Sequence, residues 1–277
     1  MAADLTAELA AGAPLIALSP HLDDAVLSCG ALLLYARERV PVTVATFFTR
    51  AGPPPYTLSG RQYLRQAGCA DAEELYAARR AEDRAVLERM GVAWRHFGLV
   101  DGLFRRKERR SPGAGGRSAR LFPELDHVYP TYRLHLSRGR LSAHDAETLR
   151  GVTDAIEALL RPGPGLVLAP LGVGGHADHV LVRTAAALSG HRVVFYSDFP
   201  YNLRKSAHAP SASFARRHAL VERSWGRGLA EKEALIRGYR TQADALFPQG
   251  MIPLVPESYL LPSTAPAATA RPSGGPS

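Results

Sequence analysis

The chain has 277 residues, of which 46% are hydrophobic and 22% are charged, a balance that suits one large globular domain. Its formal net charge of +8 is compatible with anionic partners, while its two cysteines are too few for a disulfide framework. Disulfide-rich secreted folds are therefore excluded. Because the sequence shows neither signal-peptide features nor an apolar run of bilayer-spanning length, we expect a cytoplasmic protein that does not enter a membrane.

Strand-like apolar runs alternate with helical patterns along most of the chain. In chain order, the patterns predict a strand over 14–20, a helix over 25–38, a strand over 42–48, a helix over 70–90, a strand over 94–100, a helix over 143–160, a strand over 166–172, a helix from 178, a strand over 192–199 and a helix over 229–247. Such alternation is typical of βαβ units. The predicted fold class is α/β and Rossmann-like, a mostly parallel sheet with helices on both faces.

Two segments depart from this alternation. Residues 102–142 read as an insertion near the site, and its Arg-rich part, 105–120, is broken by Gly and Pro and has no interleaved aromatic residues. We interpret 105–120 as a mobile solvated loop, and nucleic acid is not an expected partner. Residues 262–277 are rich in Pro, Ser, Ala and Gly and are predicted to be a disordered tail, which leaves 1–261 as a single domain.

Polar side chains gather where two of the predicted strands end. Residues 21-HLDD-24 follow the first strand, and 172-GVGGHADHV-180 follows the strand over 166–172. Ligands bind at the carboxyl ends of strands in open α/β sheets, so these are the places to look for chemistry. Imidazole and carboxylate groups suit Zn²⁺ or a similar divalent ion.

The spacing within each stretch supports a metal site. His21 and Asp24 can converge on one ion across a strand-to-helix turn while Asp23 projects elsewhere, and His176 and His179 are also three residues apart. Each stretch alone has a purely structural alternative, HLDD as a helix N-cap and HADH as a polar helix start. The presence of both at the strand ends of one sheet favours a metal site. A three-ligand set would leave one position for water.

These residues resemble the LmbE-like or PIG-L family of metal-dependent N-deacetylases. The family hallmarks are a first motif close to P-H-P-D-D-E and a second close to H-x-D-H, which stand here as 20-PHLDDA-25 and 176-HADH-179. The resemblance extends over most of residues 14–246, apart from the Arg-rich loop. It implies an LmbE-like fold and a hydrolase that removes an N-acetyl or short N-acyl group.

The resemblance also implies roles for individual residues. His21, Asp24 and His179 would hold Zn²⁺, or another divalent ion such as Fe²⁺, and Asp23 would be the general base that activates water. His176 would polarise the amide carbonyl or protonate the amine, with Asp178 orienting it. By the same resemblance, the best matches to substrate-binding positions are Arg79 and Asp101.

The sequence departs from the family pattern at Leu22 and Ala25, and at Gly174, where mycothiol-pathway members carry a Tyr. The expected substrate is a small N-acylated amino sugar or amino-sugar conjugate of secondary metabolism. One alternative is an amidase acting on thiol conjugates or on an N-acyl peptide or glycopeptide. Another is a basic protein that binds nucleic acid or another polyanion through 105–120. The sequence leaves open the individual substrate, the physiological metal, the role of the insertion and whether the chain forms a homo-oligomer.

Overall fold

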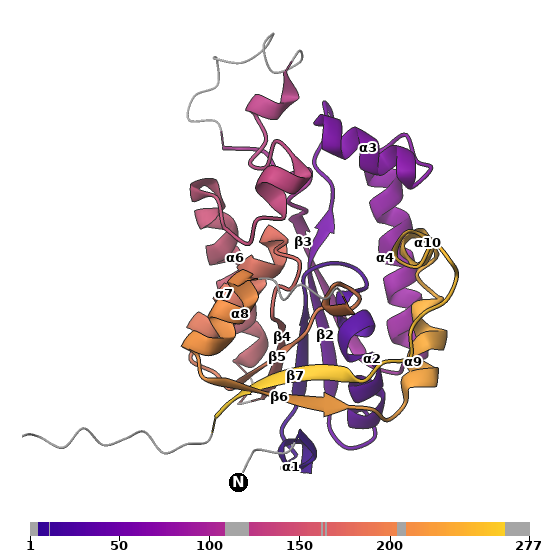
Figure 1. The fold of residues 1–277 in the computed structure, drawn as a ribbon, viewed down its shortest axis with the longest axis vertical. Helices are drawn as coiled ribbons and strands as arrows, with labels where there is room; N and C mark the ends of the chain where they lie inside the picture. The colour runs from indigo at the N-terminus through magenta and orange to yellow at the C-terminus, as the bar shows by residue number, and fades with distance from the viewer. Residues whose placement is uncertain are drawn as a thin grey trace, which may run out of the picture.

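The structure is a computed structural model that describes residues 5–10, 12–108, 122–161, 163, 165–203 and 209–263 (Figure 1). Its strands are β1 (Leu15–Ser19), β2 (Val42–Arg50), β3 (Ala93–Val100), β4 (Leu166–Pro170), β5 (Val193–Tyr196), β6 (Leu220–Trp225) and β7 (Glu257–Pro262). Its α-helices are α1 (Leu5–Ala10), α2 (Asp24–Ala36), α3 (Leu58–Gln66), α4 (Ala72–Arg89), α6 (Ala146–Leu160), α7 (Ala177–Leu188), α8 (Ala209–Arg217), α9 (Leu229–Ile236) and α10 (Arg240–Leu246). Short 3₁₀ turns lie at Pro123–Leu125, Ala143–Asp145 and Tyr201–Leu203, and a π-helix lies at Tyr132–Leu136.

All seven strands form one sheet in the order β3-β2-β1-β4-β5-β7-β6. The five strands from β3 to β5 are parallel, and β7 runs antiparallel to both β5 and β6. From β1 the chain first builds outward through β2 and β3, then returns to place β4 on the other side of β1. The strand order therefore reverses between β1 and β4, which is where open α/β sheets bind ligands.

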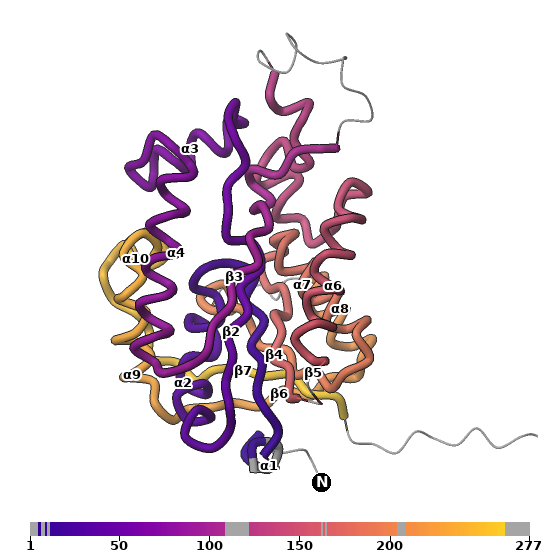
Figure 2. Tube along the Cα trace, turned by 180° about the vertical axis from the view of Figure 1, so that it is seen from behind, coloured from indigo at the N-terminus to yellow at the C-terminus, as the bar shows by residue number. Residues whose placement is uncertain are grey.

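Helices cover both faces of this sheet, as Figures 1 and 2 show. Alternate residues of β1 divide between two cores: Leu15 and Ala17 pack with α2, whereas Ile16 and Leu18 pack with α6 and α7. The period of two along a strand sends successive side chains to opposite faces, so a strand buried on both sides is apolar throughout. The predicted Rossmann-like α/β fold is confirmed.

The five predicted strands and the predicted helices are present in the described residues, with one predicted helix divided in two. Helices α1, α3 and α8 and strands β6 and β7 were not predicted. The predicted helix over 229–247 is two helices, because the chain turns at Gly238 and Tyr239 between α9 and α10. Tyr239 is buried and donates a hydrogen bond to Asp83 Oδ1 of α4 at 2.8 Å, which fixes the turn.

The interpretation of 105–120 as solvated from its first residue is wrong. Arg105 is only 6% exposed and bonds to two buried carboxylates, and Arg106 donates to the carbonyl oxygens of Pro53 and Pro55. Residues 109–121, which carry most of this prediction, lie outside the described residues, as do residues 264–277 of the predicted tail. The predicted start of the tail at 262 is wrong, because Pro262 belongs to β7 and pairs with Leu220.

The described residues contain no helix that is both long enough and apolar enough to cross a bilayer. The cytoplasmic location and homo-oligomer formation remain predictions.

The close packing of the α9–α10 turn can be tested at Gly238. A Cβ there would lie 2.5 Å from Val86 Cγ2 and 3.0 Å from the Leu235 carbonyl oxygen. We expect Gly238→Ala to lower the free energy of unfolding by about 1–3 kcal/mol through overpacking. Gly151→Ala on α6 is the control, since a Cβ there meets nothing within 4 Å, and it should be neutral or stabilise by up to about 1 kcal/mol. Urea unfolding of the wild type and both variants checks the prediction. A Gly238→Ala variant with the same free energy of unfolding as Gly151→Ala would contradict it.

Candidate metal and catalytic site

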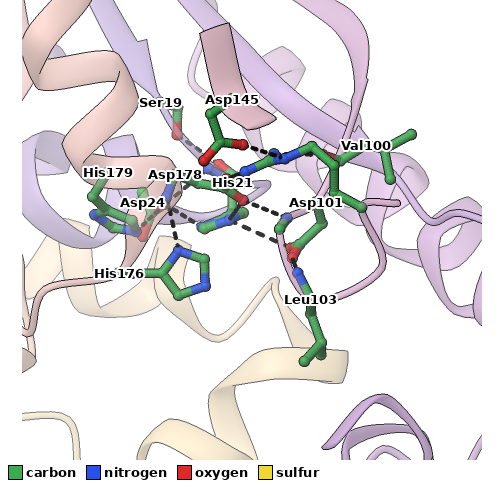
Figure 3. A network of polar contacts seen from close by, with 12 residues as sticks. Ser19, His21, Asp24, Val100, Asp101, Leu103, Asp145, His176, Asp178 and His179 are labelled. Carbon is green, nitrogen blue, oxygen red and sulfur yellow. Dashed lines mark hydrogen bonds and ion pairs between the residues drawn. The ribbon is translucent and has the colours of Figure 1, made fainter. Parts of the chain in front are cut away.

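Three strand ends supply the polar residues of the candidate site (Figure 3). His21 and Asp24 follow β1, Asp101 follows β3, and His176 and His179 lie at the start of α7 after β4. All five line one cavity of about 110 Å³. The pairing of β1 with β4 therefore brings together the two motifs that are about 150 residues apart in the sequence.

One carboxylate oxygen joins the two motifs. Asp24 Oδ2 lies 3.1 Å from His21 Nδ1 and 3.2 Å from His179 Nε2. The side chains of all three residues are buried. Two imidazole nitrogens and a carboxylate oxygen that converge in this way are the donor set that suits a divalent ion such as Zn²⁺. The structure thus brings together the three residues that the sequence predicts as metal ligands.

The other ring nitrogen of each histidine is held by a second carboxylate. His179 Nδ1 lies 2.7 Å from Asp198 Oδ1, and His21 Nε2 lies 3.1 Å from Asp178 Oδ2. An ionised carboxylate only accepts hydrogen bonds, so it fixes the proton on the nitrogen that faces it. A cation that displaces the proton between each ring and Asp24 would then meet the lone pair of the nitrogen that faces Asp24. Metal-binding histidines in proteins are oriented in the same manner.

The pKa values of His21 and His179 in the chain without a cation also indicate a cation site. Burial lowers the pKa of His21, but the neighbouring Asp101, Asp178 and Asp24 outweigh burial and raise it to about 10. For His179, burial likewise lowers the pKa while Asp24 and Asp198 raise it well above the usual value. Both rings are therefore surrounded by more negative charge than they balance, an environment that favours a bound cation.

Asp23 precedes α2, yet its side chain makes no capping hydrogen bond to the helix. The alternative in which this carboxylate serves as the N-cap is therefore wrong. Asp23 is buried and lines the cavity. Burial and then the charge of Asp24 raise its pKa to about 7, although Arg79, whose Nη2 lies 3.9 Å from Asp23 Oδ1, opposes the shift. A carboxyl group with a pKa near neutrality can both take and return a proton.

His176 lies beside the candidate ligands with its ring edge-on to His21, the centroids 4.8 Å apart. One nitrogen of His176 lies within 4.8 Å of nitrogens of His21 and His179, and His176 also forms a second such group with His21, Asp101 and Asp178. Burial and then the charge of His21 lower its pKa to about 4, so its ring is neutral at pH 7. Its Nδ1 accepts a hydrogen bond from the Asp178 backbone N–H at 3.3 Å, which places the ring proton on Nε2.

The carboxylate of Asp178 does not make the predicted contact with the His176 ring. Its Oδ2 accepts from Gly102 N at 2.8 Å and faces His21 Nε2, and its Oδ1 accepts from Arg105 Nη2 at 2.7 Å. Asp178 thus holds His21 through its side chain and His176 only through its backbone.

Arg79 and Asp101, predicted to bind substrate, both line the cavity. Arg79 is 5% exposed, its Nη1 donates to Tyr63 OH at 3.0 Å, and its buried Nε has no hydrogen-bond partner among the described residues. Asp101 accepts from Tyr76 OH at 2.5 Å and from Leu103 N at 2.8 Å. Both side chains are fixed by neighbours rather than free to rotate, so they present charges at set positions on the cavity wall.

Several residues of the site were not singled out in the sequence. Asp198 follows β5, and the rule that polar residues at strand ends carry chemistry would have found it. Tyr63 of α3, Tyr132 of the π-helix and Tyr201 after β5 line the cavity but carry no such signal. The conformation of Gly174, with φ at +88°, lets the Tyr201 ring approach to 3.4 Å from the place where a Cβ would lie.

An open parallel sheet with this donor set at its switch point defines the chain as an α/β protein with a candidate divalent-metal site. Residues 16–188 match the family model for PIG-L, described as GlcNAc-PI de-N-acetylase. Because the match covers more than half of the chain, the chain belongs to the PIG-L family. The LmbE-like resemblance seen in the sequence is confirmed.

A curated relative and several solved structures extend the comparison. The 2'-N-acetylparomamine deacetylase of Streptomyces fradiae is 33% identical over 197 residues, which are 69% of this chain and 58% of that protein. The zinc-inhibited form of a teicoplanin deacetylase has a TM-score of 0.64 at 24% identity, covering 91% of this chain and 99% of that one. A teicoplanin complex of such a deacetylase gives 0.63 at 23% identity, covering 90% and 97%. These structures share the fold of this chain.

The buried charge of Asp23 gives a testable effect on stability. Its pKa of about 7 in the folded chain exceeds the unfolded value of 3.8, so folding is penalised above pH 7 and the penalty decreases as the pH falls toward 4. We expect Asp23→Asn to raise the Tm of the metal-free protein at pH 8, with a smaller gain at pH 5. Thermal unfolding in the presence of a chelator checks this. A gain that is equal at both pH values would show that charge is not the cause.

Proposed function

We propose that the chain is a zinc-dependent hydrolase that removes an N-acetyl or short N-acyl group from an amino sugar or amino-sugar conjugate. The observation that carries the proposal is the convergence of His21 Nδ1, Asp24 Oδ2 and His179 Nε2 beside an ionisable carboxylate and a neutral imidazole. Membership of the PIG-L family supports it. The single sheet supports a single catalytic domain over 1–261.

His21, Asp24 and His179 would hold the ion. Bound zinc supplies Lewis acidity, which acidifies water and polarises a carbonyl oxygen. The carboxylates of Asp178 and Asp198 keep the lone pairs of the two histidines directed toward Asp24, so the ligand set needs little rearrangement on binding.

Asp23 would act as the general base. It lines the cavity beside Asp24, and its carboxylate makes no capping bond to α2, so it is available to accept a proton from water next to the ion. Asp23 takes a proton from water as the water oxygen attacks the amide carbon. The C–N bond then breaks, and Asp23 returns the proton to the departing amine nitrogen, so that protons balance over the cycle.

His176 would stabilise the negative charge that develops on the carbonyl oxygen. Because its Nδ1 accepts the Asp178 N–H, its Nε2–H is the group free to donate toward the cavity. A pKa of about 4 keeps this ring neutral, so it acts as a hydrogen-bond donor without adding positive charge beside the metal ligands.

Arg79 and Asp101 would contact hydroxyl groups of the substrate. A buried guanidinium and a buried carboxylate on one small cavity wall suit a polyhydroxylated ring, which can both donate and accept hydrogen bonds. The relative from Streptomyces fradiae, named for an N-acetylated amino sugar compound, supports this substrate class. An amidase acting on an N-acyl peptide or thiol conjugate is the alternative within hydrolases.

The proposed polyanion-binding alternative gains no support from the described residues. Arg105 and Arg106, the first two arginines of the Arg-rich segment, are engaged by carboxylates and carbonyl oxygens of the protein itself.

Metal content and amine release test the proposal together. We expect about one zinc per chain by elemental analysis of the wild type, lost in His179→Ala because one of three ligands is removed. Amine release is measured on N-acetylglucosamine, 2'-N-acetylparomamine and a matched N-acetyl peptide. Release from the sugars supports the proposal, and release from the peptide alone selects the amidase alternative. A wild type that neither binds zinc nor is activated by zinc or Fe²⁺ would refute both.

Replacement of the proposed base separates metal binding from turnover. Asp23→Asn retains the volume of the side chain but cannot accept a proton from water, so we expect zinc to stay bound while kcat falls by about 10²-fold or more. Steady-state kinetics and zinc analysis on the same sample check this. A variant with wild-type kcat would remove Asp23 from the mechanism.

A further inference from the structure

Arg105 lies behind the candidate metal site and does not line its cavity. It follows β3 at the start of the insertion and is 6% exposed. Its guanidinium donates from Nη2 to Asp178 Oδ1 at 2.7 Å, from Nε to Asp145 Oδ1 at 2.9 Å and from Nη1 to the Val100 carbonyl oxygen at 2.9 Å. Each of its three nitrogens therefore has a partner, and the orientation of the side chain is fixed.

The contact with Asp178 connects Arg105 to a candidate metal ligand. Asp178 Oδ1 is occupied by Arg105, and Oδ2 is shared by Gly102 N and His21 Nε2. Asp178 is fully buried, and without Arg105 its charge would face one imidazole and one backbone N–H. The guanidinium thus holds this carboxylate in the ionised, correctly rotated form that keeps the proton of His21 on Nε2.

The far side of Arg105 is anchored at Asp145, in the turn that follows the insertion. Asp145 is 1% exposed; besides Arg105, its carboxylate accepts hydrogen bonds from Tyr129 OH and from Ser142 N. It also closes the capping box that starts the turn before α6. One guanidinium therefore ties Asp145 and its hydrogen-bond donors to the carboxylate that holds the histidine after β1.

We infer that Arg105 is a positioning residue for the metal site: it fixes Asp178, and through Asp178 it directs His21 Nδ1 toward the ion. The inference rests on the proposed function, since it assigns Arg105 a role in holding the same zinc. It also assigns the insertion a part in metal retention, in addition to any contact with substrate.

Two variants test the inference. Arg105→Lys keeps the positive charge but cannot reach Asp178, Asp145 and the Val100 carbonyl at once. The double variant Arg105→Gln with Asp145→Asn removes one charge of each sign, so the interior stays balanced while Asp178 loses its partner. We expect either change to weaken zinc binding by about 10- to 100-fold, as loss of an outer-sphere partner does, and to lower kcat with little change in KM.

The measurements are zinc affinity by competition with a chromophoric chelator, the visible spectrum of the Co²⁺-loaded protein, and kcat and KM. Thermal unfolding of the metal-free forms shows that each variant is folded. Arg80→Gln is the control, because Arg80 also bonds one carboxylate, Glu73, and one carbonyl, that of Thr49, but contacts no candidate ligand. It should leave zinc affinity and the Co²⁺ spectrum unchanged.

A folded Arg105 variant with the zinc affinity and Co²⁺ spectrum of the wild type would overturn the inference. That result is distinct from failure of the proposed function, in which the wild type itself would bind no zinc and release no amine. The proposed function and the role of Arg105 are both supported if the wild type is active and zinc-bound and the Arg105 variants lose zinc at a lower chelator concentration.

Discussion

The site depends on the parallel pairing of β1 with β4. That pairing aligns Leu15 with Leu166 and places the carboxyl ends of the two strands side by side. The sheet order reverses there, so the helices that follow the two strands, α2 and α7, lie on opposite faces of the sheet and leave a gap between the strand ends. The two polar loops meet in that gap. Changes that shift the register of β1 against β4 would separate Asp24 from His179 even if every polar residue were retained.

The second requirement is tolerance of buried negative charge. Five aspartates are buried at or beside the cavity: Asp23, Asp24, Asp101, Asp178 and Asp198. Arg79 and Arg105 offset part of this charge, and the two imidazoles carry protons when no cation is bound. The arrangement is costly for folding and useful for chemistry: burial and then the charge of Asp24 raise the pKa of Asp23, and the excess of negative charge attracts a divalent ion.

Much of this could be predicted from the sequence. Strands β1, β4 and β5 are almost entirely apolar, β2 and β3 are apolar in part, and HLDD and HADH stand at strand ends, so composition and position were sufficient. Helix α3 and strand β6 were missed because their exposed faces are polar and their contacts are with distant segments. The role of Arg105 could not be read from an Arg-rich, Gly-broken stretch, since its partners Asp145 and Asp178 are 40 and 73 residues away. Long-range polar partners leave no local pattern.

The packing of Tyr201 against Gly174 has a consequence for how such sites diverge. The two residues belong to different loops, after β4 and after β5, and a Cβ at position 174 would lie in van der Waals contact with the Tyr201 ring at 3.4 Å, while φ at +88° disfavours any side chain there. The aromatic side chain at this part of the cavity therefore comes from the loop after β5, because the loop after β4 has a backbone conformation that glycine adopts without strain. Moving an aromatic residue to the loop after β4 would thus take a change in that loop's backbone as well as a change of residue, so the two loops differ in how readily they can reshape the cavity wall.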